Sequence, residues 1–260
     1  MLPREHGAWA MFAVPLLVGI GAGGKWNTNL LLLALTALGF FLLRYPLMLA
    51  IKSRAPGARL DALRWSAVYA ALAAITGVWL LLATQLLPLA AIGALGFASL
   101  AIYLWLAARR AEMSTAGEWI GIAGLALGAP AAYLVATRSL DTAAIVVYLL
   151  NVLFFGGTVL YVRFKVREQP RAVVPTTNWF ERLWAGRVTI LYHALVLTAV
   201  ALLAANGIVP ALVAVAFILP MCKVLGGVAT RSARVNLPRL GLIELSVTVA
   251  FALVVLAAYR

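Results

Sequence analysis

The chain has 260 residues, of which 65% are apolar and 11% are charged, and its mean hydropathy is +1.02. Soluble domains are about 45–50% apolar and about 25% charged, so the composition excludes an ordinary soluble protein and predicts an all-α protein that crosses a lipid bilayer several times. In a soluble chain the net charge of +13 would indicate a nucleic-acid partner. Here the positions of the basic residues are explained by the membrane, because they concentrate on one side of it, so we expect no nucleic acid. Cys222 is the single cysteine, which excludes a disulfide framework and a cysteine-based zinc site.

Nine apolar segments are long enough to be transmembrane helices, because crossing a hydrocarbon core of about 30 Å takes roughly 20 apolar residues. In chain order they are 7–24, 28–50, 65–86, 88–108, 116–137, 142–162, 186–205, 208–228 and 238–259. If the N-terminus is cytoplasmic, all of the 21 Lys and Arg residues except Lys25, Arg138 and Arg260 lie at or near the cytoplasmic side. The positive-inside rule therefore predicts a cytoplasmic N-terminus and a C-terminus outside.

Weak internal similarity relates the first four segments to the next four. The pattern R-x-x-x-x-Y-x-A-L opens the third segment at Arg64 and the seventh at Arg187, and shorter matches keep the same order. An even number of crossings per repeat makes the repeats parallel, so that corresponding residues face the same side of the membrane. We therefore expect one polytopic membrane domain over 1–260, formed by a first repeat at 4–110, a second at 116–234 and a ninth helix at 238–259.

Ionisable residues in the segments indicate where a functional site lies, because a charge in hydrocarbon costs at least about 2.5–3.5 kcal/mol and usually faces a cavity or the bundle interior. Such residues gather in the cytoplasmic third of the segments, where they are expected to line a chamber that opens to the cytoplasm. They are Glu5, His6, Arg44, Glu118, Arg163, Lys165, Lys223 and Glu244, with Asn151 and His193 as the main polar residues at mid-depth.

The cations of this set are predicted to bind a phosphate-like head group by charge-assisted hydrogen bonds. They are Arg44, Arg163, Lys165 and Lys223. Alternatively, Arg44, Arg163 and Lys165, which lie near the ends of their segments, could extend to the lipid head groups. Lys223 could instead form a structural ion pair with Glu244 between the eighth and ninth segments.

Glu5 and His6 are the candidate catalytic residues, as proton acceptors at the rim of the chamber. The supporting polar residues are Glu118, Asn151, His193 and Glu244. Each has a structural alternative. Glu5 and His6 could be solvated terminal residues, Glu118 an acid at a helix N-terminus, His193 an interior hydrogen-bonded histidine, and Asn151 a link between helices.

Two long connections at the cytoplasmic side could act as lids over the chamber. Residues 52–64 are basic and contain Pro56-Gly57, which is a turn signal. Residues Asn178–Trp184 alternate aromatic and charged side chains, which is typical of a short interfacial helix. No pair of His, Cys or acidic residues shows metal-binding spacing, so we expect no metal site.

The nine segments, the long connections after the second and sixth, and the four-helix repeat resemble the UbiA superfamily of intramembrane prenyltransferases. The sequence itself is similar to the YwiC-like family of bacterial integral membrane proteins, in REHGAWAMFAVPLL at 4–17, GLALGAPAAYL at 124–134 and NVLFFGGTVLYVRFKVRE at 151–168. This resemblance covers most of the chain and implies a multi-pass protein of the bacterial inner membrane.

The resemblance to UbiA enzymes implies aspartate-rich motifs at the ends of the second and sixth helices, where carboxylates hold Mg²⁺ and a prenyl diphosphate. This chain departs from that pattern, because Arg44 and Lys52 stand at the first place and Arg163 and Lys165 at the second. Neither place can chelate a hard cation, which takes several oxygen ligands. We therefore predict no Mg²⁺ and no other cofactor.

The predicted partners are the lipid bilayer and an amphiphilic anion, such as an isoprenoid or lipid phosphate or a porphyrin-like carboxylate. One hypothesis is a divergent UbiA-type prenyl or lipid transferase that works without aspartate-bound magnesium. The alternatives are a protein that binds a lipid or other amphiphile without chemistry, and a transporter in which Lys223 and Glu244 form a proton-coupled pair.

Overall fold

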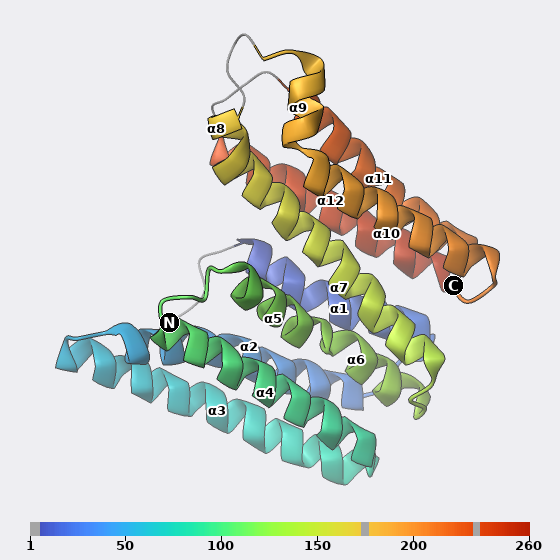
Figure 1. The fold of residues 1–260 in the computed structure, drawn as a ribbon. Helices are drawn as coiled ribbons and strands as arrows, with labels where there is room; N and C mark the ends of the chain where they lie inside the picture. The colour runs from blue at the N-terminus through green and yellow to red at the C-terminus, as the bar shows by residue number, and fades with distance from the viewer. Residues whose placement is uncertain (1–5, 173–176, 231–234) are drawn as a thin grey trace. The chain divides into compact units, whose positions relative to one another are not determined.

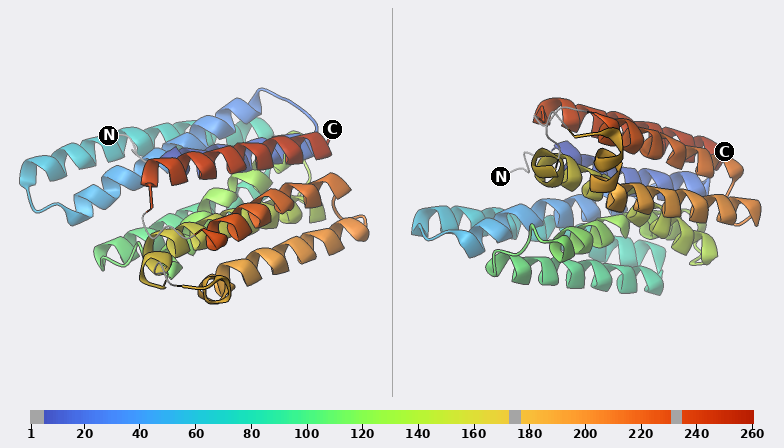
Figure 2. Two further views of the ribbon diagram at one scale, coloured as in Figure 1. Left: turned by 90° about the horizontal axis from the view of Figure 1, so that it is seen from above. Right: turned by 45° about the horizontal axis from the view of Figure 1, so that its top comes forward.

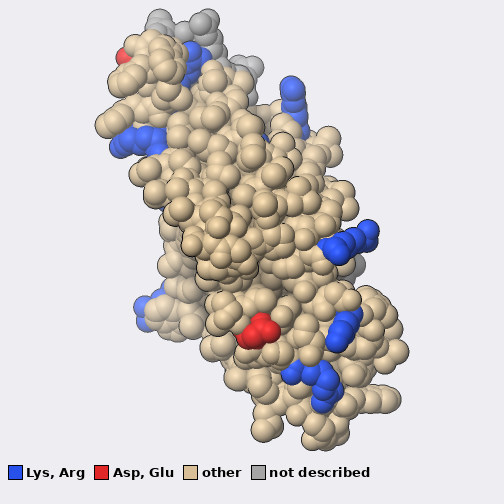
Figure 3. Space-filling model, turned by 90° about the vertical axis from the view of Figure 1, so that its right-hand side faces the viewer, with Lys and Arg blue, Asp and Glu red and all other residues tan. Residues whose placement is uncertain are grey.

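All regular structure in the computed structural model, which describes residues 6–172, 177–230 and 235–260, is helical (Figure 1). This confirms the all-α class. Each of the nine predicted segments coincides with a helix or a pair of helices in these residues. Eight helical stretches are long and apolar enough to cross a membrane, whereas α1 (His6–Gly23) is shorter. Few charged side chains appear on the face shown in Figure 3, which is the right-hand side of Figure 1, where several helices end. The repeat and the count of nine spans stay predictions.

The chain divides into two compact units within α7 (Thr142–Arg163), at Val152–Leu153. The N-terminal unit contains α1, α2 (Asn29–Lys52), α3 (Pro56–Thr84), α4 (Leu87–Ala108), α5 (Thr115–Ala126), α6 (Gly128–Thr137) and the first part of α7. The C-terminal unit contains the rest of α7, a π-helix η1 (Phe164–Glu168), α8 (Gln169–Ala172), α9 (Trp179–Ala185), α10 (Arg187–Ala205), α11 (Ala211–Ala229) and α12 (Leu237–Ala258).

Helices α2 and α3 pack side by side along their length (Figures 1 and 2). A side chain at Gly39 would come within 2.7 Å of the backbone nitrogen of Ala73, so the two backbones approach closely there. The hydroxyl groups of Thr36 and Thr76 lie 2.9 Å apart and join the same helices. Small residues and hydroxyl pairs are the usual means by which helices associate in lipid, where apolar surface alone gives no preference for a protein neighbour.

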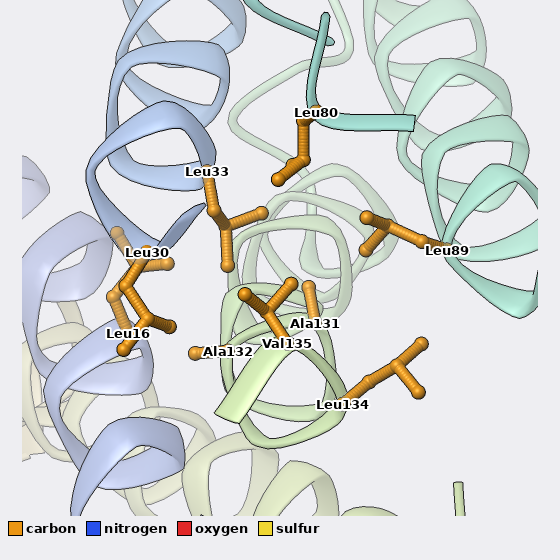
Figure 4. Packing of buried hydrophobic residues seen from close by; sticks show 9 residues of the cluster. All are labelled: Leu16, Leu30, Leu33, Leu80, Leu89, Ala131, Ala132, Leu134 and Val135. Atoms are coloured by element: carbon orange, nitrogen blue, oxygen red, sulfur yellow. The ribbon is translucent and has the colours of Figure 1, made fainter. Parts of the chain in front are cut away.

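A second packing region holds α1, α2, α3, α4 and α6 together near one end of the N-terminal unit. Its buried side chains are mostly leucine and alanine (Figure 4): Leu16, Leu30, Leu33, Leu80, Leu89, Ala131, Ala132, Leu134 and Val135. Gly19 of α1 lies so close to α6 that an added Cβ would overlap the carbonyl oxygen of Ala129. The glycine-rich end of α1 therefore serves close helix packing, which fixes α1 against α6.

One sequence interpretation of the N-terminal unit is wrong, and one confirmed segment has an irregularity. Residues 52–64 are not a loop, because α3 begins at Pro56; a proline at the first helical position needs no N–H partner and has the φ angle of a helix. The segment 116–137 is confirmed as a stretch long and apolar enough to span the membrane, Thr115–Thr137, with a break at Leu127 between α5 and α6. Pro130 explains the break, because it lacks the N–H that a continuous helix would use at that point.

Aromatic packing forms the centre of the C-terminal unit. Phe154 of α7 stacks on Phe251 of α12 with ring centroids 3.9 Å apart, and Phe217 of α11 meets Phe251 edge to face at 5.4 Å. Phe154 and Phe251 are almost completely buried. Offset stacked and edge-to-face rings are favourable arrangements, so these three residues fix α7, α11 and α12 against one another.

Candidate functional site

A partly open, mostly apolar cavity of about 400 Å³ lies within the N-terminal unit, walled by residues of α1 to α6. Along α2 it extends from Leu33 to Arg44, a rise of about 16 Å at 1.5 Å per residue. Its volume is within the range of ligand pockets, which is about 300–1,000 Å³. The polar side chains in its lining are Thr36, Arg44, Ser99 and Tyr103.

Two of the lining hydroxyl groups already have hydrogen-bond partners. The Thr36 hydroxyl donates to the carbonyl oxygen of Leu32 at 2.8 Å, and the Ser99 hydroxyl donates to the carbonyl oxygen of Ile120 at 2.9 Å. These groups are therefore occupied by the helices. Arg44 is the one charged side chain among the described residues that line the cavity.

The guanidinium group of Arg44 is held at one end of this cavity by an aromatic ring. Its Cζ lies 4.6 Å from the ring centroid of Tyr103 in α4, and the Tyr103 hydroxyl donates to the sulfur of Met48 at 3.9 Å. Gly121 of α5 leaves space beside the guanidinium, because an added Cβ there would lie 3.8 Å from Nη1. Across the described part of the chain, no carboxylate forms an ion pair with Arg44. The cation therefore borders a mostly apolar cavity.

Glu118 belongs to the first turn of α5, whose N-cap is Ser114. The Ser114 hydroxyl oxygen accepts a hydrogen bond from the backbone N–H of Gly117 at 3.2 Å. The carboxylate oxygen Oε2 of Glu118 is buried and has no hydrogen-bond partner within the described residues. Glu118 is not part of the cavity lining, so its role as a supporting polar residue stays a prediction.

A second acid of the N-terminal unit, Glu112, forms an ion pair with Lys52 at the end of α2. The hydrogen bond from Lys52 holds the pKa of Glu112 below its usual range, against the opposing effect of burial, and the charge of Arg110 acts in the same direction as Lys52. This pair ties the connection between α4 and α5 to α2.

The other three predicted anion-binding cations belong to the C-terminal unit, and each has a protein partner there. Lys223 donates to both carboxylate oxygens of Glu244 at 2.8 Å. Lys165 donates to the carbonyl oxygen of Gly227 at 3.1 Å and to the hydroxyl of Thr230 at 3.3 Å. Arg163 lies 3.9 Å from a carboxylate oxygen of Glu168.

Lys223 and Glu244 form a buried pair between α11 and α12, as the structural alternative anticipates. Side-chain exposure is only 6% for Lys223 and 12% for Glu244. The Lys223 ammonium also lies 4.6 Å from the ring centroid of Tyr161 in α7. A paired charge with an aromatic neighbour explains how an ammonium group is accommodated inside this unit. The contribution of Lys223 to anion binding stays a prediction.

Asn151 and His193 are both buried and bonded within their own helices. The Asn151 side-chain amide donates to the carbonyl oxygen of Val147 at 2.8 Å, and its own oxygen has no partner among the described residues. The His193 Nδ1 lies 2.8 Å from the carbonyl oxygen of Thr189, and its imidazole packs against Gly157 of α7. His193 therefore has the geometry of an interior hydrogen-bonded histidine.

The two candidate catalytic residues are at the edge of the described chain. Glu5 lies outside the described residues, and the structure describes His6 as the first residue of α1 without its side chain. In the described ranges, no three His, Cys, Asp or Glu residues are grouped as metal ligands would be. The predictions on catalysis and on cofactors stay untested.

Sequence reasoning missed the side chains that complete the C-terminal end of α11. Gln169 is fully buried and donates to the carbonyl oxygens of Gly227 and Thr230, both at 3.3 Å. Arg182 of α9 donates to the carbonyl oxygen of Ala229 at 2.7 Å. The last carbonyl groups of a helix have no partners within it, and Lys165, Gln169 and Arg182 supply donors to those of Gly227 and Ala229. No local pattern reveals such contacts between distant segments.

The eight long apolar helical stretches define the class of this chain as a multi-pass, all-helical membrane protein. The chain belongs to the YwiC-like protein family, whose match covers residues 2–133. All residues that line the cavity fall within this range.

Two bacterial relatives are similar over most of the chain. The Bacillus subtilis (strain 168) relative, named Uncharacterized protein YwiC, is 26% identical over 75% of this chain and 79% of its own length. The Haemophilus influenzae (strain ATCC 51907 / DSM 11121 / KW20 / Rd) relative, named Uncharacterized protein, is 26% identical over 99% of this chain and 98% of its own length. No solved structure matches the chain.

Proposed function

We propose that the protein binds a membrane-soluble amphiphile with an anionic head group, such as an isoprenoid or lipid phosphate. The tail would lie in the cavity of the N-terminal unit and the head group at Arg44. One observation carries the proposal: a guanidinium group without an ion-pair partner in the described residues stands at one end of a mostly apolar cavity. An arginine offers several N–H donors in a plane that matches a phosphate or carboxylate.

The opening of the cavity supports a ligand that comes from the bilayer. Ala74 and Val78 of α3 and Ala90 and Gly93 of α4 line the cavity and are also exposed. The cavity therefore opens between two helices that are long and apolar enough to span the membrane. An apolar tail can enter there without crossing water, because lipid would cover this surface.

The lining supports binding rather than acid–base chemistry. Among the described residues it contains no carboxylate and no imidazole, which are the usual general acids and bases. A UbiA-type transferase would need His6 or Glu5 to supply that chemistry, so the transferase remains the second form of this proposal. By the positive-inside rule we place Arg44 at the cytoplasmic leaflet of a bacterial inner membrane.

Binding of farnesyl phosphate, farnesol and inorganic phosphate to the purified full-length protein tests the proposal. We expect the wild type to prefer farnesyl phosphate, since farnesol lacks the charge and inorganic phosphate lacks the tail. Arg44→Gln should weaken farnesyl phosphate binding about 10- to 100-fold, the value of a hydrogen bond to a charged group, and should leave farnesol binding unchanged.

Two matched controls accompany this variant. Arg109 also stacks on an aromatic ring, 3.9 Å from the centroid of Trp105, but does not line the cavity, so Arg109→Gln should bind as the wild type does. Gly93→Leu narrows the cavity and should weaken the binding of farnesyl phosphate and of farnesol. Its control is Gly226→Leu, which adds the same side chain at an exposed helical position elsewhere and should leave both affinities unchanged. Undiminished farnesyl phosphate binding by Arg44→Gln overturns the proposal.

A further inference from the structure

Helix α9 has its polar and apolar side chains arranged opposite to those of a surface helix in water. Trp179, Phe180 and Trp184 are 67%, 64% and 62% exposed. Arg182 is buried on the other side, where it donates to the carbonyl oxygens of Asn178 and Ala229. Burying a guanidinium while exposing three large aromatic rings is unfavourable in water, so the medium around this helix is not bulk water.

Local sequence fixes the residue at which α9 begins. Asn178 and Glu181 form a reciprocal capping box, in which each side chain accepts a hydrogen bond from the backbone N–H of the other at 2.9 Å. The bond from Arg182 to Ala229 then attaches the helix to the end of α11. These contacts fix which side of α9 faces away from the C-terminal unit.

The exposed aromatic side of α9 continues into an exposed apolar stripe on α10. Trp184 is followed by Val188, Leu191 and Leu195, which are all about 60% exposed and recur at helical spacing. Helix α10 is a candidate membrane span, and α9 directly precedes it. The surface that lipid covers along α10 therefore extends without interruption onto α9.

Positive charge accompanies these rings. The guanidinium of Arg187 lies 4.5 Å from the ring centroid of Trp184, and Arg187 is exposed. Further basic residues lie on neighbouring ends of the helices of this unit: Lys165, Arg167, Arg171 and Arg239. Tryptophan beside arginine suits the interfacial layer, where the ring sits at head-group level and the cation meets lipid phosphate.

We propose that α9 is an interfacial anchor: it lies in the head-group layer of the membrane, with Trp179, Phe180 and Trp184 in contact with phospholipid and Arg187 directed to anionic lipid phosphate. The anchor holds the connection between α8 and α10 on the membrane surface. This inference does not depend on ligand binding in the N-terminal unit.

Spin labels on the full-length protein in vesicles of phosphatidylglycerol and phosphatidylcholine test the anchor. With Cys222→Ala as the background, a nitroxide is placed at Phe180→Cys, and its accessibility to oxygen and to a water-soluble nickel complex gives its depth. Labels at Leu195→Cys, within α10, and at Asp61→Cys, in the charged first part of α3, provide the deep and aqueous references. We expect the label at 180 to lie between them, at head-group level.

A matched pair of variants then tests the aromatic rings themselves. Trp179→Ser with Trp184→Ser should move the label at 180 toward the aqueous reference and leave the label at 195 unchanged. Trp26→Ser removes an equally exposed ring from the other unit and should leave both readings unchanged. The proposal is overturned if the label at 180 reads as aqueous in the parent, if protein shields it from both reagents, or if removing the two rings leaves its depth unchanged.

Discussion

The ammonium group of Lys223 lies 2.8 Å from both carboxylate oxygens of Glu244 and thereby joins α11 to α12. The two charges are buried together in the C-terminal unit. A pair of this kind is unfavourable to break, because removing one partner leaves the other charge buried and uncompensated.

Neutralising one member of this pair should therefore destabilise the protein strongly. We expect Lys223→Met or Glu244→Gln to lower the free energy of unfolding by about 3–5 kcal/mol, measured by thermal or denaturant unfolding in detergent micelles. The double variant Lys223→Met with Glu244→Leu should recover most of that loss. Arg64→Gln breaks an exposed pair with Asp61 and should change stability by less than about 1 kcal/mol. Equal losses of unfolding free energy in the variants of the buried pair and of the exposed pair would contradict the proposed role of the buried charges.

Gly19 should not tolerate a larger side chain, because a Cβ there would overlap the carbonyl oxygen of Ala129. We expect Gly19→Ala to lower the unfolding free energy by about 1–3 kcal/mol, as overpacking usually does. Gly93→Ala is the control, since its Cβ would meet open space, and its better helix propensity should leave stability unchanged or slightly higher. Parallel thermal unfolding curves of the two variants provide the comparison.

The pair of Glu112 with Lys52 should make stability depend on pH in the acidic range. Because the folded protein holds the pKa of Glu112 below its usual value, the pair stabilises the fold above the usual glutamate pKa of about 4.3. This stabilisation is lost as the pH falls through the lower folded-state pKa. The wild type should thus be more stable than Glu112→Gln near neutral pH, and the difference should shrink on acidification. Asp61→Asn breaks an exposed pair and is the control, which should change stability near neutral pH by less than about 1 kcal/mol.

Asp141 should contribute to the start of α7 as its cap. Its carboxylate accepts hydrogen bonds from the backbone N–H groups of Ala143 at 2.9 Å and Ala144 at 3.4 Å, and from the Tyr133 hydroxyl at 3.0 Å. Asp141→Ala should lower the unfolding free energy by about 1 kcal/mol, whereas Asp141→Asn keeps an accepting oxygen and should lose less. Thermal unfolding of both variants gives the comparison. A larger loss for Asp141→Ala indicates the cap, whereas equal losses would indicate that the negative charge alone matters.

The positions of the helices were predictable because runs of apolar residues and their basic ends report directly on the membrane. The break at Leu127 was less visible, although Gly128 and Pro130 mark it. The extension of α7 through the π-helix Phe164–Glu168 carries no clear signal, since that stretch is rich in charge. In this stretch Lys165 contacts the end of α11, which no local pattern reveals.

The candidate site was only partly predictable, because contacts between helices that are distant in the sequence leave no local pattern. Sequence position singles out Arg44 as a cation in an apolar helix, and the structure places it in a cavity. Its neighbour Tyr103 could not be identified in advance, because it is one aromatic residue among many and only the packing of α2 against α4 brings the two together. Convergence of Arg44 with Arg163 on one chamber stays a prediction.

The side chains that complete the end of α11 also imply an order of assembly. Lys165, Gln169 and Arg182 leave the ribosome before Gly227 and Ala229, whose carbonyl oxygens accept their hydrogen bonds. Until α11 has been synthesised and inserted, these donors have no such acceptors, so α9 docks late in biogenesis. A nascent chain arrested before residue 211 should therefore leave 165–172 and 179–185 open to protease, and completion of the chain should protect both segments.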